Sequence, residues 1–180
     1  MISLRSKISQ KLLSYLFLNE DSTLYLNQIK RKFDFDKRNL NKKLKELCSK
    51  GILESEVIGN QKYYSLNKNH PLYNEYKKLV LKSFGLEELL ETSFKNYEEI
   101  EKAYVFGSYA NNNMDVTSDI DLLIVGDVSL KLVNKIIIDI QENYDREINP
   151  VIMSKEEFIN RKKNNDSFIK SVLKNNIRIK

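Results

Sequence analysis

Residues 107–125 read GSYANNNMDVTSDIDLLIV and join a Gly-Ser turn to two aspartates at the head of an apolar strand. Alternation along a strand places Asp119 and Asp121 on one face with their carboxylates adjacent. Adjacent carboxylates raise each other's pKa unless a cation lies between them, so the pair favours bound Mg²⁺. Gly107 lets backbone approach a ligand, and a helix starting near Ser108 would direct free amides at phosphates. The stretch therefore predicts a site for a metal-bound triphosphate, with a solvated polar strand end as the alternative.

Helices and strands are expected on both sides of this stretch. Apolar periodicity predicts helices over residues 86–101 and 129–143, and strands over residues 103–106, 119–125 and 146–153. In the last strand Glu147 and Asn149 share a face, so Glu147 could join the aspartates as a third carboxylate if the strands are neighbours. Asp145 is a rival for that role, although we expect it in the turn. Pro150 cannot donate a ladder hydrogen bond, which predicts an edge strand or a bulge.

The spacing and strand context of these residues resemble a known signature. Gly107-Ser108, ten further residues and then Asp119-x-Asp121, followed by a strand with a carboxylate, is similar to the DNA polymerase β-type nucleotidyltransferases and their minimal group. The resemblance implies an α/β fold with a small mixed sheet. It implies Mg²⁺ on Asp119, Asp121 and Glu147, and a nucleoside triphosphate, expected to be ATP, held by Gly107 and Ser108. The implied reaction transfers a nucleoside monophosphate to an acceptor and releases pyrophosphate.

The chain departs from that signature in two ways. Many family members continue the Gly-Ser-x-Ala segment with Arg-Gly, whereas this chain has Asn111-Asn112, which removes a cationic phosphate contact. The third carboxylate is Glu147, one methylene longer than the usual aspartate. These two departures bear on whether the site catalyses transfer or only binds nucleotide.

The first half of the chain predicts three helices followed by a β-hairpin. Apolar residues at helical spacing cover residues 5–18, 24–33 and 36–50, and two alternating runs cover residues 52–58 and 61–66. Gly59-Asn60 between the runs is typical of a hairpin turn. This order, with a basic third helix, resembles the winged helix-turn-helix domains of small prokaryotic transcriptional regulators over residues 5–68.

In such a domain the third helix enters the major groove of DNA. The side chains of the types that bond base edges and phosphates are Arg38, Asn39, Asn41, Lys42 and Lys45, and Gln61 and Lys62 at the hairpin tip would contact the DNA backbone. The alternative is a solvated face on a domain used for dimerisation or protein contacts.

Charge divides the chain into two parts. Residues 1–80 hold 16 Lys+Arg against 8 Asp+Glu, a net charge of +8, whereas residues 81–180 hold 14 against 17, a net charge of −3. Different charges suggest different partners. We therefore expect an α+β protein with a winged-helix domain over residues 1–68, a linker and connecting helix over residues 69–85, and a nucleotidyltransferase domain over residues 86–180.

Composition indicates a cytoplasmic protein without a membrane partner. Hydrophobic residues make up 41% of the chain and charged residues 31%, which is ordinary for a soluble protein. The apolar segment over residues 12–18 is too short to span a bilayer. The single cysteine, Cys48, excludes an internal disulfide, fits a reducing compartment and is interpreted as a buried structural thiol.

Three functions follow from these patterns. The leading hypothesis is a Mg²⁺-dependent nucleotidyltransferase whose acceptor is a partner protein, for instance the toxin of a toxin-antitoxin pair, and whose winged helix binds operator DNA as a homodimer to regulate transcription. The second is a non-catalytic transcriptional regulator whose nucleotidyltransferase domain only binds nucleotide. The third is transfer to a nucleic-acid end, and only the positive charge of the first half of the chain supports it.

Overall fold

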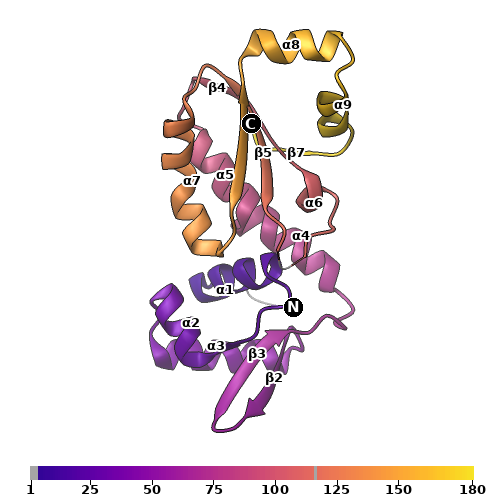
Figure 1. The fold of residues 1–180 in the computed structure, drawn as a ribbon. Coiled ribbons are helices and arrows are strands. Elements are labelled where there is room, and N and C mark those ends of the chain that lie inside the picture. Colours follow the sequence, from indigo (N-terminus) through magenta and orange to yellow (C-terminus); the bar gives the residue numbers. More distant parts are fainter. Residues whose placement is uncertain (1–3, 116) are drawn as a thin grey trace. The chain divides into compact units, whose positions relative to one another are not determined.

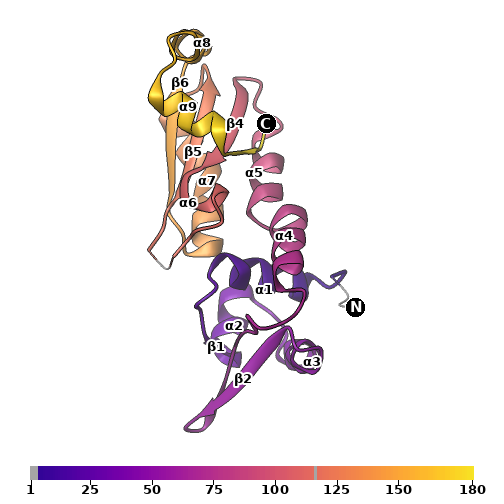
Figure 2. The ribbon, with the colours of Figure 1, turned by 90° about the vertical axis from the view of Figure 1, so that its right-hand side faces the viewer.

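A computed structural model describes residues 4–115 and 117–180, which form a mixed α+β structure (Figures 1 and 2). The chain divides into two compact units, one reaching to Glu87 and the other running from Glu88 to Lys180. Helix α5 (Leu86–Phe94) spans the boundary. Within the described residues no helix is long and apolar enough to cross a membrane.

The first unit contains helices and one small sheet. Its elements are α1 (Lys7–Leu18), β1 (Leu24–Tyr25), α2 (Leu26–Phe33), α3 (Lys37–Ser49), β2 (Leu53–Ile58), β3 (Gln61–Leu66) and α4 (Tyr73–Phe84). The three predicted helices and the hairpin are confirmed as elements. The second helix starts later than predicted, because Leu24 and Tyr25 pair with β3 and form an extra strand in the antiparallel order β1-β3-β2.

Helices α1 and α3 supply much of the core of this unit. Leu12 and Leu13 of α1 and Leu40, Leu44 and Leu47 of α3 are fully buried. The α3 leucines are spaced by four and then three residues, which places them on one stripe of that helix. Helix α3 begins where it was predicted to begin, because the carboxylate of Asp36 accepts a hydrogen bond from the Asn39 amide at 2.9 Å.

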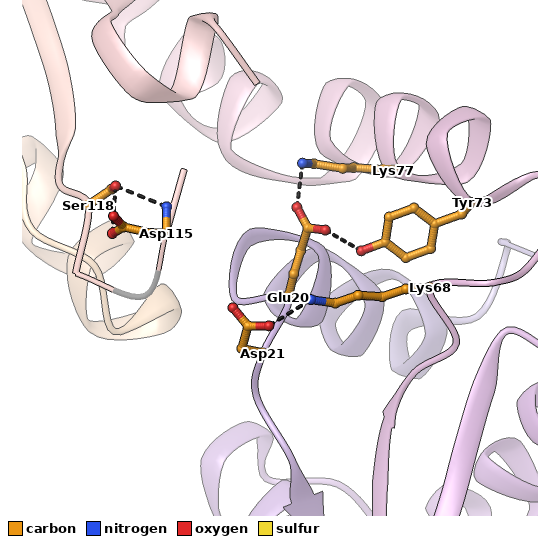
Figure 3. Close-up of polar contacts among 7 residues, drawn as sticks. All are labelled: Glu20, Asp21, Lys68, Tyr73, Lys77, Asp115 and Ser118. Carbon is orange, nitrogen blue, oxygen red and sulfur yellow. Dashed lines mark hydrogen bonds and ion pairs between the residues drawn. The ribbon is translucent and has the colours of Figure 1, made fainter. Parts of the chain in front are cut away.

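Helix α4 belongs to the first unit through its contacts with α1. Glu20, just after α1, accepts hydrogen bonds from the Tyr73 hydroxyl and the Lys77 ammonium group (Figure 3). The Ser14 hydroxyl donates to the Phe84 carbonyl at 3.2 Å. Burial, and then the bond to Glu20, raises the pKa of Tyr73. These contacts hold the end of α4 on α1 and its first turns on the segment that follows α1.

The second unit is a four-stranded mixed sheet with helices on both sides. Its further elements are β4 (Ile100–Phe106), α6 (Gly107–Ala110), β5 (Ile120–Gly126), α7 (Leu130–Tyr144), β6 (Ile148–Met153), α8 (Lys155–Lys163), α9 (Ser167–Lys174) and β7 (Ile177–Arg178). The strand order is β6-β5-β4-β7, with β5 and β6 parallel and the other pairs antiparallel. This agrees with the small mixed sheet that was expected, and β6, which contains Pro150, is an edge strand as predicted.

The central strand β5 is buried on both faces. Leu123 and Val125 pack with Phe158 of α8 and Ile169 of α9, and Figure 1 shows α7 on the other side of the sheet from α9. This two-sided cover explains the continuous apolar run that follows the aspartates. The helix predicted over residues 86–101 ends at Phe94 instead, because Ile100 pairs with Gly126 and so belongs to β4.

Candidate active site

The two aspartates lie at the start of the central strand. Asp119 immediately precedes β5 and Asp121 is its second residue, while Ile120 between them is fully buried. In the sheet, Asp121 is opposite Phe106, the last residue of β4, and beside Asn149 of β6. Burial, and then the neighbouring charge of Asp119, raises the pKa of Asp121. The two aspartates therefore lie at the start of β5, beside the last residue of β4 and the second residue of β6.

Gly107 packs directly against one of these carboxylates. It follows β4, opens the short helix α6 and has a φ of +70°. A Cβ at this position would lie 2.1 Å from Asp121 Oδ2. The approach of the Gly107 backbone to a ligand stays a prediction, and in the structure the group that it approaches is the Asp121 carboxylate. Ser108, the next residue of α6, is therefore held on the same turn.

Asn111 and Asn112, which depart from the signature described above, follow the Gly107 turn directly. Asn111 Nδ2 donates to the Gly107 carbonyl at 2.8 Å, and Asn175 donates a hydrogen bond to the side-chain oxygen of Asn111. Asn112 has a φ of +53°, a left-handed conformation that asparagine tolerates. Asn111 thus stabilises the Gly107 turn from within and brings no positive charge to it.

Arg146 fixes the loop that leads to the aspartates. The residue is 8% exposed, and Nη1 donates to the carbonyl oxygens of Asp115 at 2.9 Å and Ser118 at 2.8 Å. The Asp115 carboxylate accepts further hydrogen bonds from Ser118 (Figure 3) and Thr117, which hold its pKa below the usual range. Sequence reasoning missed Arg146, because arginines are mostly exposed and its acceptors come from a distant loop.

Asn149 is the side chain of β6 that contacts the aspartates. Its Nδ2 donates to Asp119 Oδ2 at 3.0 Å. Glu147 is exposed and precedes β6, and its main-chain oxygen accepts from the Ile120 amide at 2.9 Å. Asp145 ends α7 with a φ of +50°. In the described parts of the chain, no three His, Cys, Asp or Glu side chains form a group that could hold a metal ion, so the site brings together two carboxylates and one amide.

The aspartate pair nevertheless fits a divalent cation. Carboxylate oxygens are the ligands that Mg²⁺ prefers in proteins. The raised pKa of Asp121 reflects both its burial and the adjacent charge of Asp119, and a cation between the two carboxylates would relieve that repulsion. Asp119 and Asp121 are therefore the residues that would hold the ion.

In the first unit, the residues predicted to contact DNA are exposed on α3 or line a groove beside it. Asn41 and Lys62 both line a groove between α3 and the β2–β3 hairpin. Lys43 pairs with Glu46 at 2.6 Å, whereas none of the described carboxylates forms an ion pair with the four exposed cations of α3, which are Lys37, Arg38, Lys42 and Lys45. Asn39 is also exposed. The helix therefore presents a basic face.

Comparison with known proteins places the second unit in a family. The family "Polymerase beta, Nucleotidyltransferase" matches residues 88–180. A Methanocaldococcus jannaschii protein named "Putative protein adenylyltransferase" is 42% identical over 74 residues, which cover 41% of this chain and 72% of that protein. The crystal structure of a "putative nucleotidyltransferase" from Sulfolobus solfataricus is similar at 20% identity over 41% of this chain and 68% of the other, with a TM-score of 0.29. The chain belongs to the polymerase β nucleotidyltransferase family.

Proposed function

We propose that the second unit transfers a nucleoside monophosphate from a nucleoside triphosphate to an acceptor, with release of pyrophosphate. The observation that carries this proposal is the Asp119 and Asp121 pair, held against the backbone of Gly107 at the ends of neighbouring strands. Transfer of a phosphoryl group requires mainly positioning and charge neutralisation. Two paired carboxylates suit charge neutralisation through a bound cation, and the neighbouring Gly107 turn suits the positioning of the phosphates.

Each residue of the site has a separate role in this proposal. Gly107 and Ser108 hold the triphosphate, and Asp119 and Asp121 hold Mg²⁺. The bound ion would neutralise charge on the phosphates. Arg146 keeps the loop before Asp119 in place through its two carbonyl contacts. The role that the family resemblance implies for Glu147 stays a prediction.

We further propose that the nucleotide is ATP and that the acceptor is a protein. The support is the name of the Methanocaldococcus jannaschii relative, which describes a protein adenylyltransferase. A toxin partner of a toxin-antitoxin pair would be an acceptor of this class.

The transfer proposal is tested with α-phosphate-labelled nucleoside triphosphates and Mg²⁺ in lysate of the source cell. The wild-type protein should transfer label to a protein band, and the matched Asp119→Ala/Asp121→Ala variant should not. Tight nucleotide binding by the wild type without transfer to any macromolecule would refute it.

A second candidate function is nucleotide binding without transfer, as the signal of a transcriptional regulator. One observation favours it, namely that the β6 side chain in contact with Asp119 is the amide of Asn149 and not a carboxylate that could act as a base. The labelling experiment separates the two functions, because the regulator would bind labelled nucleotide reversibly and leave every protein unmodified.

The first unit is proposed to be a winged helix that binds operator DNA as a homodimer in the cytoplasm. Its order of three helices and a hairpin, and the exposed cations of α3, support this proposal. The groove beside Asn41 and Lys62 would receive the DNA backbone. Binding of DNA by this unit would let the protein regulate its own transcription.

A further inference from the structure

Asn149 occupies a defined position next to both aspartates. It lies beside Asp121 in the parallel register of β5 and β6, and its Nδ2 is 3.0 Å from Asp119 Oδ2. The side chain is exposed, so its position is not explained by packing in the core. Its one hydrogen bond described in the structure is the bond to Asp119.

The amide changes what the site can bind. A donated N–H occupies a lone pair of Asp119 Oδ2, and it directs the positive end of a dipole at that oxygen. A second cation on this side of Asp119 would therefore face a hydrogen-bond donor, the Asn149 N–H, and not an oxygen ligand. If the amide turned to offer its oxygen instead, it would still add no negative charge.

The charge of the site is suited to one cation. Two-metal sites hold their ions about 3.5–4 Å apart, and anionic ligands must offset the repulsion between them. Here the protein contributes two carboxylates, and among residues 4–115 and 117–180 no third His, Cys, Asp or Glu side chain joins them in a group that could hold a metal ion. A single ion shared by Asp119, Asp121 and the triphosphate satisfies this arrangement.

We infer that the site binds one divalent cation with its nucleotide, and that Asn149 is a positioning residue that orients Asp119 and blocks a second ion. The inference rests on the proposed function only in its nucleotide-binding part, and it does not require transfer to occur. It gives the site a stoichiometry of one metal ion, which distinguishes this chain from family members that carry a third carboxylate.

The experiment counts Mn²⁺ by electron paramagnetic resonance of the free ion, with the full chain and a non-hydrolysable ATP analogue. The wild type should bind one Mn²⁺ per nucleotide complex. Asn149→Asp, which is nearly isosteric, should bind two. Asn149→Ala should still bind one, with affinity lower by roughly 10-fold or more, since an outer partner that orients a ligand typically contributes that much to metal affinity.

Controls separate the possible failures. Analogue mixed with the Asp119→Ala/Asp121→Ala variant gives the Mn²⁺ bound by nucleotide alone. Two ions in the wild type, or one ion in a folded Asn149→Asp variant, would overturn the inference while leaving nucleotide binding intact. A wild-type count of two that falls to one in Glu147→Gln would assign the second ion to Glu147 and also overturn it. Failure of the wild type to bind the analogue at all would overturn the proposed function as well.

Discussion

Replacing Gly107 with alanine should damage the nucleotide site through two separate effects. The φ of +70° strains any residue with a Cβ by about 1–2 kcal/mol. The new Cβ would also lie 2.1 Å from Asp121 Oδ2, where contacts under 3.0 Å are essentially never found. The carboxylate must therefore retreat by about 1 Å, a displacement that can lower the activity of a catalytic site by about 100-fold.

Gly59 provides a matched control for the backbone strain. It has a φ of +63° in the β2–β3 turn, and a Cβ there would meet no atom within 4 Å. Gly59→Ala therefore carries comparable strain without a clash and lies in the other unit. We expect the affinity for Mg²⁺ with a non-hydrolysable ATP analogue to fall at least about 10-fold in Gly107→Ala, or about 1.4 kcal/mol. The same affinity should be unchanged in Gly59→Ala.

Isothermal titration calorimetry measures both affinities, and circular dichroism verifies that each variant is folded. If folded Gly107→Ala bound the metal-nucleotide complex as tightly as the wild type, the Asp121 carboxylate would not be the group that the glycine accommodates in the working site. The assignment of Gly107 and Asp121 to one binding surface would then be wrong.

Three further predictions concern other residues. Arg146→Met leaves two loop carbonyls without their donor and should lower the free energy of unfolding by roughly 2 kcal/mol. Arg146→Lys should retain part of this lost stability. Equal denaturation midpoints for the wild type and Arg146→Met would contradict this role. The raised pKa of Asp121 means that the folded state holds its proton more tightly than the unfolded state, so metal-free stability should fall as pH rises through that pKa. Asp121→Asn should lose this dependence and melt at a higher temperature than the wild type near neutral pH, and identical melting curves would refute the argument. Arg38→Ala should weaken binding to operator DNA and reduce the salt dependence of that binding in a fluorescence anisotropy titration. Lys43→Ala removes a lysine that is paired with Glu46 and should lower the affinity for DNA less. An affinity for DNA that depends neither on salt nor on Arg38 would count against a helix that reads the groove.

Local sequence patterns were sufficient for most of the fold. Alternation predicted a strand over residues 119–125, and β5 begins one residue later, with Asp119 just before it and Asp121 in it. Pro150 placed β6 at an edge because a proline cannot donate to a ladder. These signals depend on a few neighbouring residues, so they can be recognised without knowing which distant residues each segment contacts.

The features that sequence reasoning missed depend on distant partners. Strand β7 has two residues and exists through its pairing with β4. The burial of Arg146 depends on carbonyls that lie about 30 residues away. Alternation placed Glu147 and Asn149 on one face, but only the register with β5 shows that Asn149 reaches Asp119. Side-chain contacts of this kind follow from strand pairing, which periodicity alone does not specify.

The residue after Asn149 also determines how durable the amide is. Asparagine ages to aspartate when the backbone nitrogen of the next residue attacks the side-chain amide and forms a cyclic imide. Pro150 has no N–H, and its ring nitrogen is already fully substituted. The Asn149-Pro150 bond should therefore suppress this route of deamidation, and the difference between an amide and an acid beside Asp119 should persist through the lifetime of the protein.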